Sequence, residues 1–107
     1  MIAHSPHEVY SANLNSPHTL TWRYIELTPN ERDLVIYLRR RAAETPDAPI
    51  PHLDIIRHIW GPRADADMLP NLYRLVSLAN AHLARLGMSE RIVGRRGKGY
   101  LWAGETL

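Results

Sequence analysis

Apolar residues recur with the helical period in three consecutive segments of the chain. The first segment starts at Pro29 and ends near Arg41, the second covers about 51–60, and the third covers about 68–86. In the third segment the apolar positions advance by about 100° per residue and form one side of a helix: Leu72, Leu75, Val76, Ala79, Leu83 and Leu86. The pattern therefore predicts three amphipathic helices.

Local signals mark the ends of these helices. Thr28 can cap the first helix, Pro29 suits its first position, and the Glu31 side chain can reach back to the cap. Arginines at 39–41 follow at the other end, where the helix dipole favours cations. A glycine follows each of the other two segments. These signals support the three helices independently of the apolar pattern.

Two stretches outside the helices have the composition of β-strands. Residues 18–27 place Leu20, Trp22 and Tyr24 at alternate positions, which predicts one or two strands. Residues 91–102 place two short apolar pieces on either side of a glycine-rich basic turn, which predicts a β-hairpin.

The expected fold class is therefore α+β, with short N-terminal antiparallel strands, three helices and a C-terminal hairpin. We expect residues 18–104 to form this domain, and 1–17 to be either a partly mobile segment or an edge strand. The length of 107 residues suits one domain.

Composition argues against several classes of site. The chain has no Cys, which removes disulfides, thiolate zinc sites and cysteine nucleophiles. The closest histidine pairs, His4/His7 and His52/His58, have no third ligand at metal-site spacing, and no nucleophile–base or phosphate-loop motif is present. We therefore expect no enzymatic activity, cofactor or metal. A long apolar run and a secretory signal are also lacking, so a cytoplasmic protein without membrane contact is expected.

The charges are unevenly distributed. The net charge is only +2, and every cation except Lys98 is an arginine. Four cations gather near the C-terminus, with Glu90 as the neighbouring acid: Arg91, Arg95, Arg96 and Lys98. The planar fork of arginine suits phosphate, because it donates two hydrogen bonds at once. By itself the run fits either a phosphate-binding turn or a solvated surface.

Three local motifs occur in order along the chain. They are Leu27-Thr28-x-x-Glu31, Ile59-Trp60-Gly61 and Ile92-x-x-x-Arg96-Gly97-x-Gly99-Tyr100. They are similar to the first-helix start, the second-helix end and the wing of the OmpR/PhoB-type DNA-binding domain, the effector half of many bacterial response regulators. The resemblance covers about 19–102. It implies a winged helix-turn-helix fold, with the third helix in the DNA major groove and the wing, 94–99, on the minor groove or phosphates.

This resemblance implies two sets of contact residues. Base reading is expected from the outward side of the third helix: Asn71, Tyr73, Arg74, Ser77, Asn80 and Ala81. Arginine suits guanine and asparagine suits adenine in the major groove. Backbone or wing contacts are expected from His52, Arg57, Arg85, Arg95, Arg96, Gly97 and Lys98. The alternatives are a solvated helix face, a solvated turn and, for His52, an ordinary surface histidine.

Two functions remain open from the sequence. The first is a sequence-specific regulator of transcription that binds double-stranded DNA and, as is common in this family, pairs as a homodimer there. The second is a winged-helix interaction module that contacts RNA polymerase or another regulator, with weak or no DNA binding. The second is favoured by the third helix, where Leu78-Ala79-Asn80-Ala81 replaces basic residues of the family and Arg74 is the main cation. The chain is too short to hold a receiver domain as well, so we expect control by level, partner or assembly.

Overall fold

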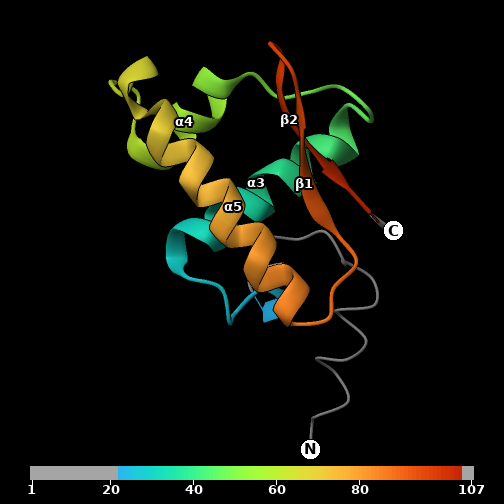
Figure 1. Ribbon diagram of the computed structural model, residues 1–107. Coiled ribbons are helices and arrows are strands. Elements are labelled where there is room, and N and C mark those ends of the chain that lie inside the picture. Colours follow the sequence, from blue (N-terminus) through green and yellow to red (C-terminus); the bar gives the residue numbers. More distant parts are fainter. Residues whose placement is uncertain (1–21, 105–107) are drawn as a thin grey trace, which may run out of the picture.

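The computed structural model describes residues 22–104 (Figure 1). Along the chain it contains helix α3 (Pro29–Glu44), helix α4 (His52–Trp60), the 3₁₀ turn η1 (Ala66–Met68), helix α5 (Leu69–Arg85), strand β1 (Arg91–Arg95) and strand β2 (Gly99–Ala103). The fold of this part is α+β, with three helices and a C-terminal antiparallel hairpin, as the sequence predicts. This layout is compatible with a winged helix.

Helix α3 begins with the capping box that the sequence predicts. Thr28 Oγ1 accepts a hydrogen bond from the Glu31 N–H at 3.4 Å, and the Thr28 N–H donates to Glu31 Oε1 at 3.1 Å. The buried Glu31 carboxylate also meets His82 Nδ1 of α5 at 2.7 Å. The Glu31 side chain therefore stabilises both the start of α3 and the packing of α5 against α3.

The core lies where α3 meets α4, α5 and β2. Its buried apolar residues are Tyr24, Leu27, Leu34, Val35, Leu38, Ile50, Ile55, Ile56, Leu72, Leu75, Val76, Ala79, Leu83, Ile92 and Trp102. Five of the six residues of the apolar stripe predicted for α5 belong to this core, whereas Leu86 follows the helix and is 39% exposed. Among residues 22–104, no helix is long and apolar enough to cross a membrane.

The hairpin pairs β1 with β2 in antiparallel register, with Arg91 opposite Ala103 and Arg95 opposite Gly99. A third segment joins it: Ile50, just before α4, exchanges both backbone hydrogen bonds with Tyr100, at 2.7 and 3.0 Å. Gly99 makes this approach possible, because it has a φ of 132° and a Cβ there would overlap the Ile50 carbonyl. The bridge therefore fixes the hairpin to the segment that leads into α4.

The strand prediction for 18–27 is wrong for the part of that segment that the structure describes. Trp22 and Arg23 are helical, and a turn follows at 24–26. Tyr24 and Leu27, three residues apart, are the two buried positions, and the Leu27 N–H donates to the Tyr24 carbonyl at 3.1 Å. The burial pattern thus follows a helical turn rather than a strand. Residues 18–21, and the edge strand considered within 1–17, lie outside the described residues.

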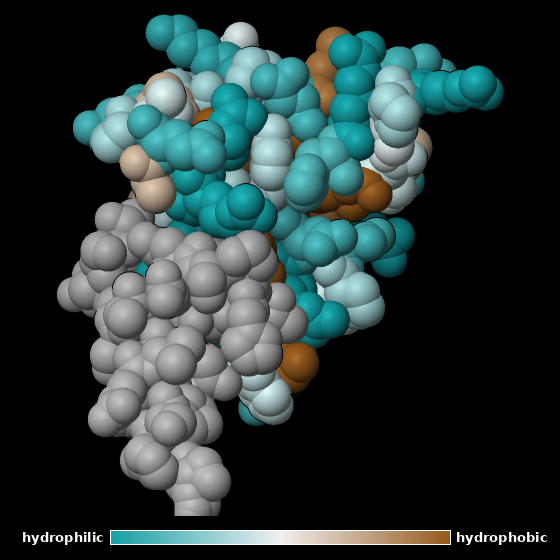
Figure 2. Space-filling model, turned by 180° about the vertical axis from the view of Figure 1, so that it is seen from behind, coloured by the Kyte–Doolittle hydropathy of each residue, from teal (hydrophilic) through white to brown (hydrophobic). Residues whose placement is uncertain are grey.

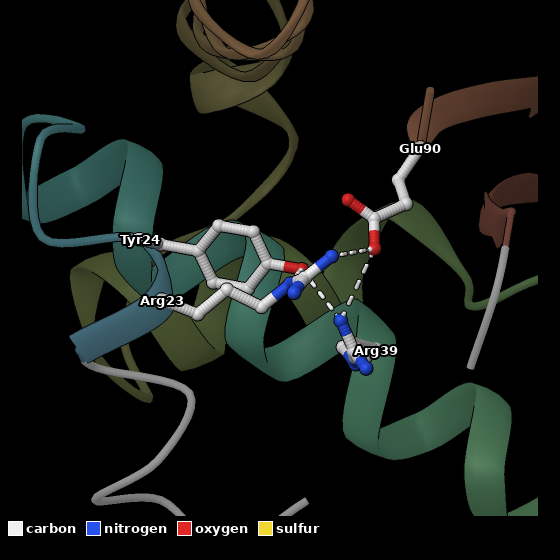
Figure 3. A network of polar contacts seen from close by, with 4 residues as sticks. All are labelled: Arg23, Tyr24, Arg39 and Glu90. Atoms are coloured by element: carbon white, nitrogen blue, oxygen red, sulfur yellow. Dashed lines mark hydrogen bonds and ion pairs between the residues drawn. The ribbon is translucent and has the colours of Figure 1, made fainter. Parts of the chain in front are cut away.

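A buried polar network connects this turn to the base of the hairpin (Figure 3). The Arg39 guanidinium donates to the Tyr24 hydroxyl at 2.7 Å and to Glu90 Oε2 at 3.3 Å. Arg23 donates to the same carboxylate oxygen at 2.7 Å. Partial burial lowers the pKa of Arg23, whereas the hydrogen bonds of Arg23 to Tyr24 and Glu90 raise it. The hydrogen bonds outweigh burial, so the pKa lies above the ordinary value. The network therefore joins three parts of the chain far apart in sequence.

Candidate nucleic-acid interface

Helix α5 presents a narrow outward face. The side chains of Arg74, Ser77 and Ala81 are exposed and lie within about 60° of one another around the helix axis. Asn71 and Tyr73 are also exposed, but they lie on opposite flanks, about 160° apart. Of the six residues expected to read bases, three therefore share one exposed face of α5.

Asn80 is a correction to the base-reading set, because its amide is engaged within the protein. Its Nδ2 donates to the Ile92 carbonyl at 3.0 Å, and its Oδ1 accepts from the Ile92 N–H at 2.8 Å. The side chain thus points at strand β1 and satisfies backbone groups on the strand edge. Asn80 positions the hairpin against α5 and does not present its amide to a base.

The hairpin turn carries a cluster of exposed cations. Arg95, Arg96 and Lys98 are all exposed, and Gly97 has a φ of 71° at the turn between them. Within the described residues, none of these three cations lies within 4.0 Å of a carboxylate. Their charges are therefore not neutralised by an internal ion pair and are available to an anionic partner.

His52 lies between α5 and the hairpin. Its ring is edge-on to Tyr73 of α5, with centroids 6.0 Å apart, and edge-on to Tyr100 of β2 at 5.4 Å. A cleft of about 240 Å³ opens here, lined by these three rings and by wing residues that include Arg95 and Arg96. Burial raises the pKa of the Tyr100 hydroxyl above its usual value, and the nearby Tyr73 hydroxyl raises it further.

Two further hollows adjoin this cleft, one between the start of α4 and the hairpin turn and the other between α5 and β1. One, of about 300 Å³, shares His52 and Gly97 with it and also reaches Lys98. The other, of about 510 Å³, shares Gly94 with it and reaches Arg91 and Asn80. We refer to the three adjoining hollows as the trough. The exposed cations on its hairpin side are Arg91, Arg95, Arg96 and Lys98.

The remaining expected contacts are not brought to this trough. Arg57 is exposed on α4, and its Nε donates to the Ala64 carbonyl at 3.2 Å. Arg85 is the last residue of α5 and lies about 140° around the axis from Asn80, which faces the hairpin. The hairpin turn lies at the other end, near the start of α5 (Figure 1), where Leu69 and Lys98 line the same hollow.

Two residues of the site are not among the contacts that the sequence predicts. Tyr100 lines the cleft, and its ring lies against Gly94. Ile50 holds β2 through its backbone. The Tyr100 position carried a usable signal, because a tyrosine next to a glycine-rich basic turn is close to any ligand of that turn.

Comparison with known proteins identifies no relative: no family model, curated protein or solved structure matches this chain. Within residues 22–104, no three His, Asp or Glu side chains gather in a way that could hold a metal ion. His4 and His7 lie outside those residues. Interpretation of the site therefore depends on its own geometry and charge.

Proposed function

We propose that the protein is a winged-helix regulator that binds double-stranded DNA with sequence preference. Helix α5 enters the major groove, and the β1–β2 hairpin contacts the adjacent minor groove or its phosphates. The observation that carries this proposal is the group of exposed cations Arg95, Arg96 and Lys98, which form no ion pair with a carboxylate of residues 22–104 and lie beside the start of α5. A major groove about 12 Å wide admits a helix, and arginine is favoured in a narrow minor groove.

Salt dependence provides the direct test. Fluorescence anisotropy of a labelled mixed-sequence duplex is measured between 50 and 200 mM salt, where log K falls by roughly 0.9 per phosphate contact for each unit of log[salt]. We expect micromolar binding at low salt and a loss of roughly 10-fold to 1,000-fold across this range. Absence of binding at 50 mM salt would contradict the proposal.

A triple wing variant tests the docking. Replacing Arg95, Arg96 and Lys98 with alanine should weaken binding to all duplexes and reduce the salt slope by up to about 2.7. The control replaces Arg40 and Arg63, which are exposed arginines outside both α5 and the wing, and its loss is compared with that of the wing variant per charge removed. Equal losses per charge in the two variants would show only a dependence on net charge.

A protein-interaction function is the second candidate. Leu78 of α5 is 42% exposed, Leu86 is 39% exposed, and the outward face of the helix between them carries few cations. Figure 2 shows the rear of the molecule, where hydrophilic residues cover most of the described surface and apolar residues form small separate patches. A partner such as RNA polymerase would bind through the limited apolar surface that Leu78 and Leu86 offer. If no duplex binds, a pull-down with RNA polymerase and Leu78→Ser as the control variant tests this function.

A further inference from the structure

The trough between α5 and the hairpin has the shape and charge for a polyanionic chain. Its three hollows adjoin one another at shared lining residues: His52 and Gly97 for two of them, and Gly94 for the third. Four exposed cations stand on its hairpin side, and the Tyr73 and Tyr100 rings form walls of the central hollow. The one carboxylate in its lining, Glu90, is 3% exposed and paired with Arg23 and Arg39.

The trough follows the length of β1 and α5. Arg91 and Arg95 lie on the same face of β1, four residues and therefore about 13 Å apart. Tyr73 and Ala84, which line the trough from α5, lie on the flank of the helix that faces β1, within about 40° of Asn80. The trough therefore runs beside α5 and is lined along its length from both sides.

A DNA duplex docked in this way would place the sugar-phosphate backbone of one strand at the trough. If α5 occupies the major groove and the hairpin reaches the adjacent minor groove, the strand that separates these grooves has to pass between them. We propose that the sugar-phosphate backbone of one DNA strand lies in this trough, and that Tyr73 and Arg91 contact its phosphates. This inference depends on the DNA-binding function proposed above and specifies which surface holds the backbone.

The proposal changes the role of two residues. Tyr73 becomes a phosphate contact rather than a base reader, because its side chain faces the hairpin and not the outward side of α5. Arg91 lies at the opposite end of β1 from the basic turn, so the turn alone does not predict a contact there. The proposal makes Arg91 a phosphate contact. Direct reading then remains for Arg74, Ser77 and Ala81 on the outward face and for Asn71 on the flank away from the hairpin.

The test for Tyr73 uses two duplexes, one selected from a random library with the unmodified protein and one with the same bases scrambled. A phosphate contact contributes equally to both, whereas a base contact contributes only to the selected duplex. We expect Tyr73→Phe to weaken both by the same factor, up to about 10-fold, because the lost hydrogen bond is to a charged group. A fall in the selected-to-scrambled affinity ratio, or unchanged binding to both duplexes, would overturn the proposal.

The test for Arg91 uses Arg40 of α3 as a matched control. Both arginines are exposed and removal of either changes the charge equally, but Arg40 lies on neither α5 nor the hairpin. Arg91→Ala should reduce the slope of log K against log[salt] by about 0.9, and Arg40→Ala should leave it unchanged. If the wild-type protein binds DNA but the two variants have equal slopes, the DNA backbone does not lie in the trough and the proposal is wrong. Failure of the wild-type protein to bind either duplex would overturn the DNA-binding function itself.

Discussion

The amide of Asn80 makes two hydrogen bonds to one residue, Ile92, as donor to its carbonyl at 3.0 Å and as acceptor from its N–H at 2.8 Å. This pairing resembles that of a neighbouring strand, and it satisfies the outward backbone groups of Ile92 on the exposed edge of β1. An edge strand with satisfied groups is a poor template for pairing with another chain. The same contact fixes the spacing between α5 and the hairpin, and therefore the width of the trough.

Replacing Asn80 should destabilise the fold. Asn80→Ala leaves both backbone groups of Ile92 without their protein partner, and we expect a loss of about 2 kcal/mol in the free energy of unfolding. Urea denaturation followed by circular dichroism measures this change. Ser77→Ala, at an exposed position of the same helix, is the control and should change stability by less than about 0.5 kcal/mol. Equal stabilities for the two variants would contradict the structural role of Asn80.

Two glycines of the hairpin should respond differently to alanine. Gly99→Ala places a methyl group on the Ile50 carbonyl in a backbone conformation that other residues rarely adopt, so a loss of about 3 kcal/mol is expected. Gly97→Ala, at a φ of 71° with open space around it, should lose only about 1 kcal/mol. Thermal denaturation of the two variants tests the difference, and a reversed order would show that the Ile50–Tyr100 bridge is not important.

The ion pair at Glu90 should contribute far more than a surface pair. Glu90→Ala leaves the Arg39 guanidinium buried without its carboxylate, and breaking such a pair costs about 3–5 kcal/mol. Glu44→Ala removes the exposed partner of Arg41 at 3.9 Å and should cost less than about 1 kcal/mol. Chemical denaturation at pH 7 compares them. A similarly small loss in both variants would show that the Glu90 carboxylate is solvated rather than buried.

The elements of this fold are largely readable from the sequence because their signals are local. The capping box of Thr28 and Glu31, the apolar stripe of α5 and the glycine-rich turn all act over a few residues, and all three correspond to observed features. The strand expected at 18–27 is wrong over the described part, 22–27, because the buried pair is Tyr24 and Leu27, three residues apart, whereas Trp22 of the alternating set is exposed. Only tertiary contacts, such as the Tyr24 hydroxyl with Arg39, decide between a strand and a helical turn.

The site was harder to predict because its important contacts are distant in sequence. An exposed-looking asparagine on a helix can face a base or a backbone, and the choice for Asn80 depends on where β1 lies. The single bridge from Ile50 to Tyr100 joins residues 50 positions apart and has no periodic pattern. The cations of the wing were predictable as a group from the sequence. Which flank of α5 faces them could be known only from the position of the helix in the structure.

Alkaline pH should weaken the fold through Tyr100. Its pKa is raised in the folded state, so the unfolded chain loses the proton at lower pH than the folded one. The stability that this group contributes is fully present below about pH 10, the ordinary tyrosine value, and is lost as the pH rises through the folded-state pKa. Denaturation between pH 9 and 11 should show a smaller decline for Tyr100→Phe than for the wild-type protein. Parallel declines would show that the Tyr100 hydroxyl ionises at its ordinary pKa.

Arg74 should determine sequence preference rather than overall affinity. It is exposed on the outward face of α5, and within the described residues no hydrogen bond or ion pair restrains its guanidinium. A bidentate arginine–guanine contact contributes about 1–3 kcal/mol of discrimination, so Arg74→Ala should reduce the ratio of selected to scrambled affinity by about 10-fold. Arg40→Ala removes the same charge from an exposed position of α3 and should leave that ratio unchanged. Anisotropy titrations with both duplexes measure the ratio, and an equal reduction in the two variants would show that α5 does not read bases through Arg74.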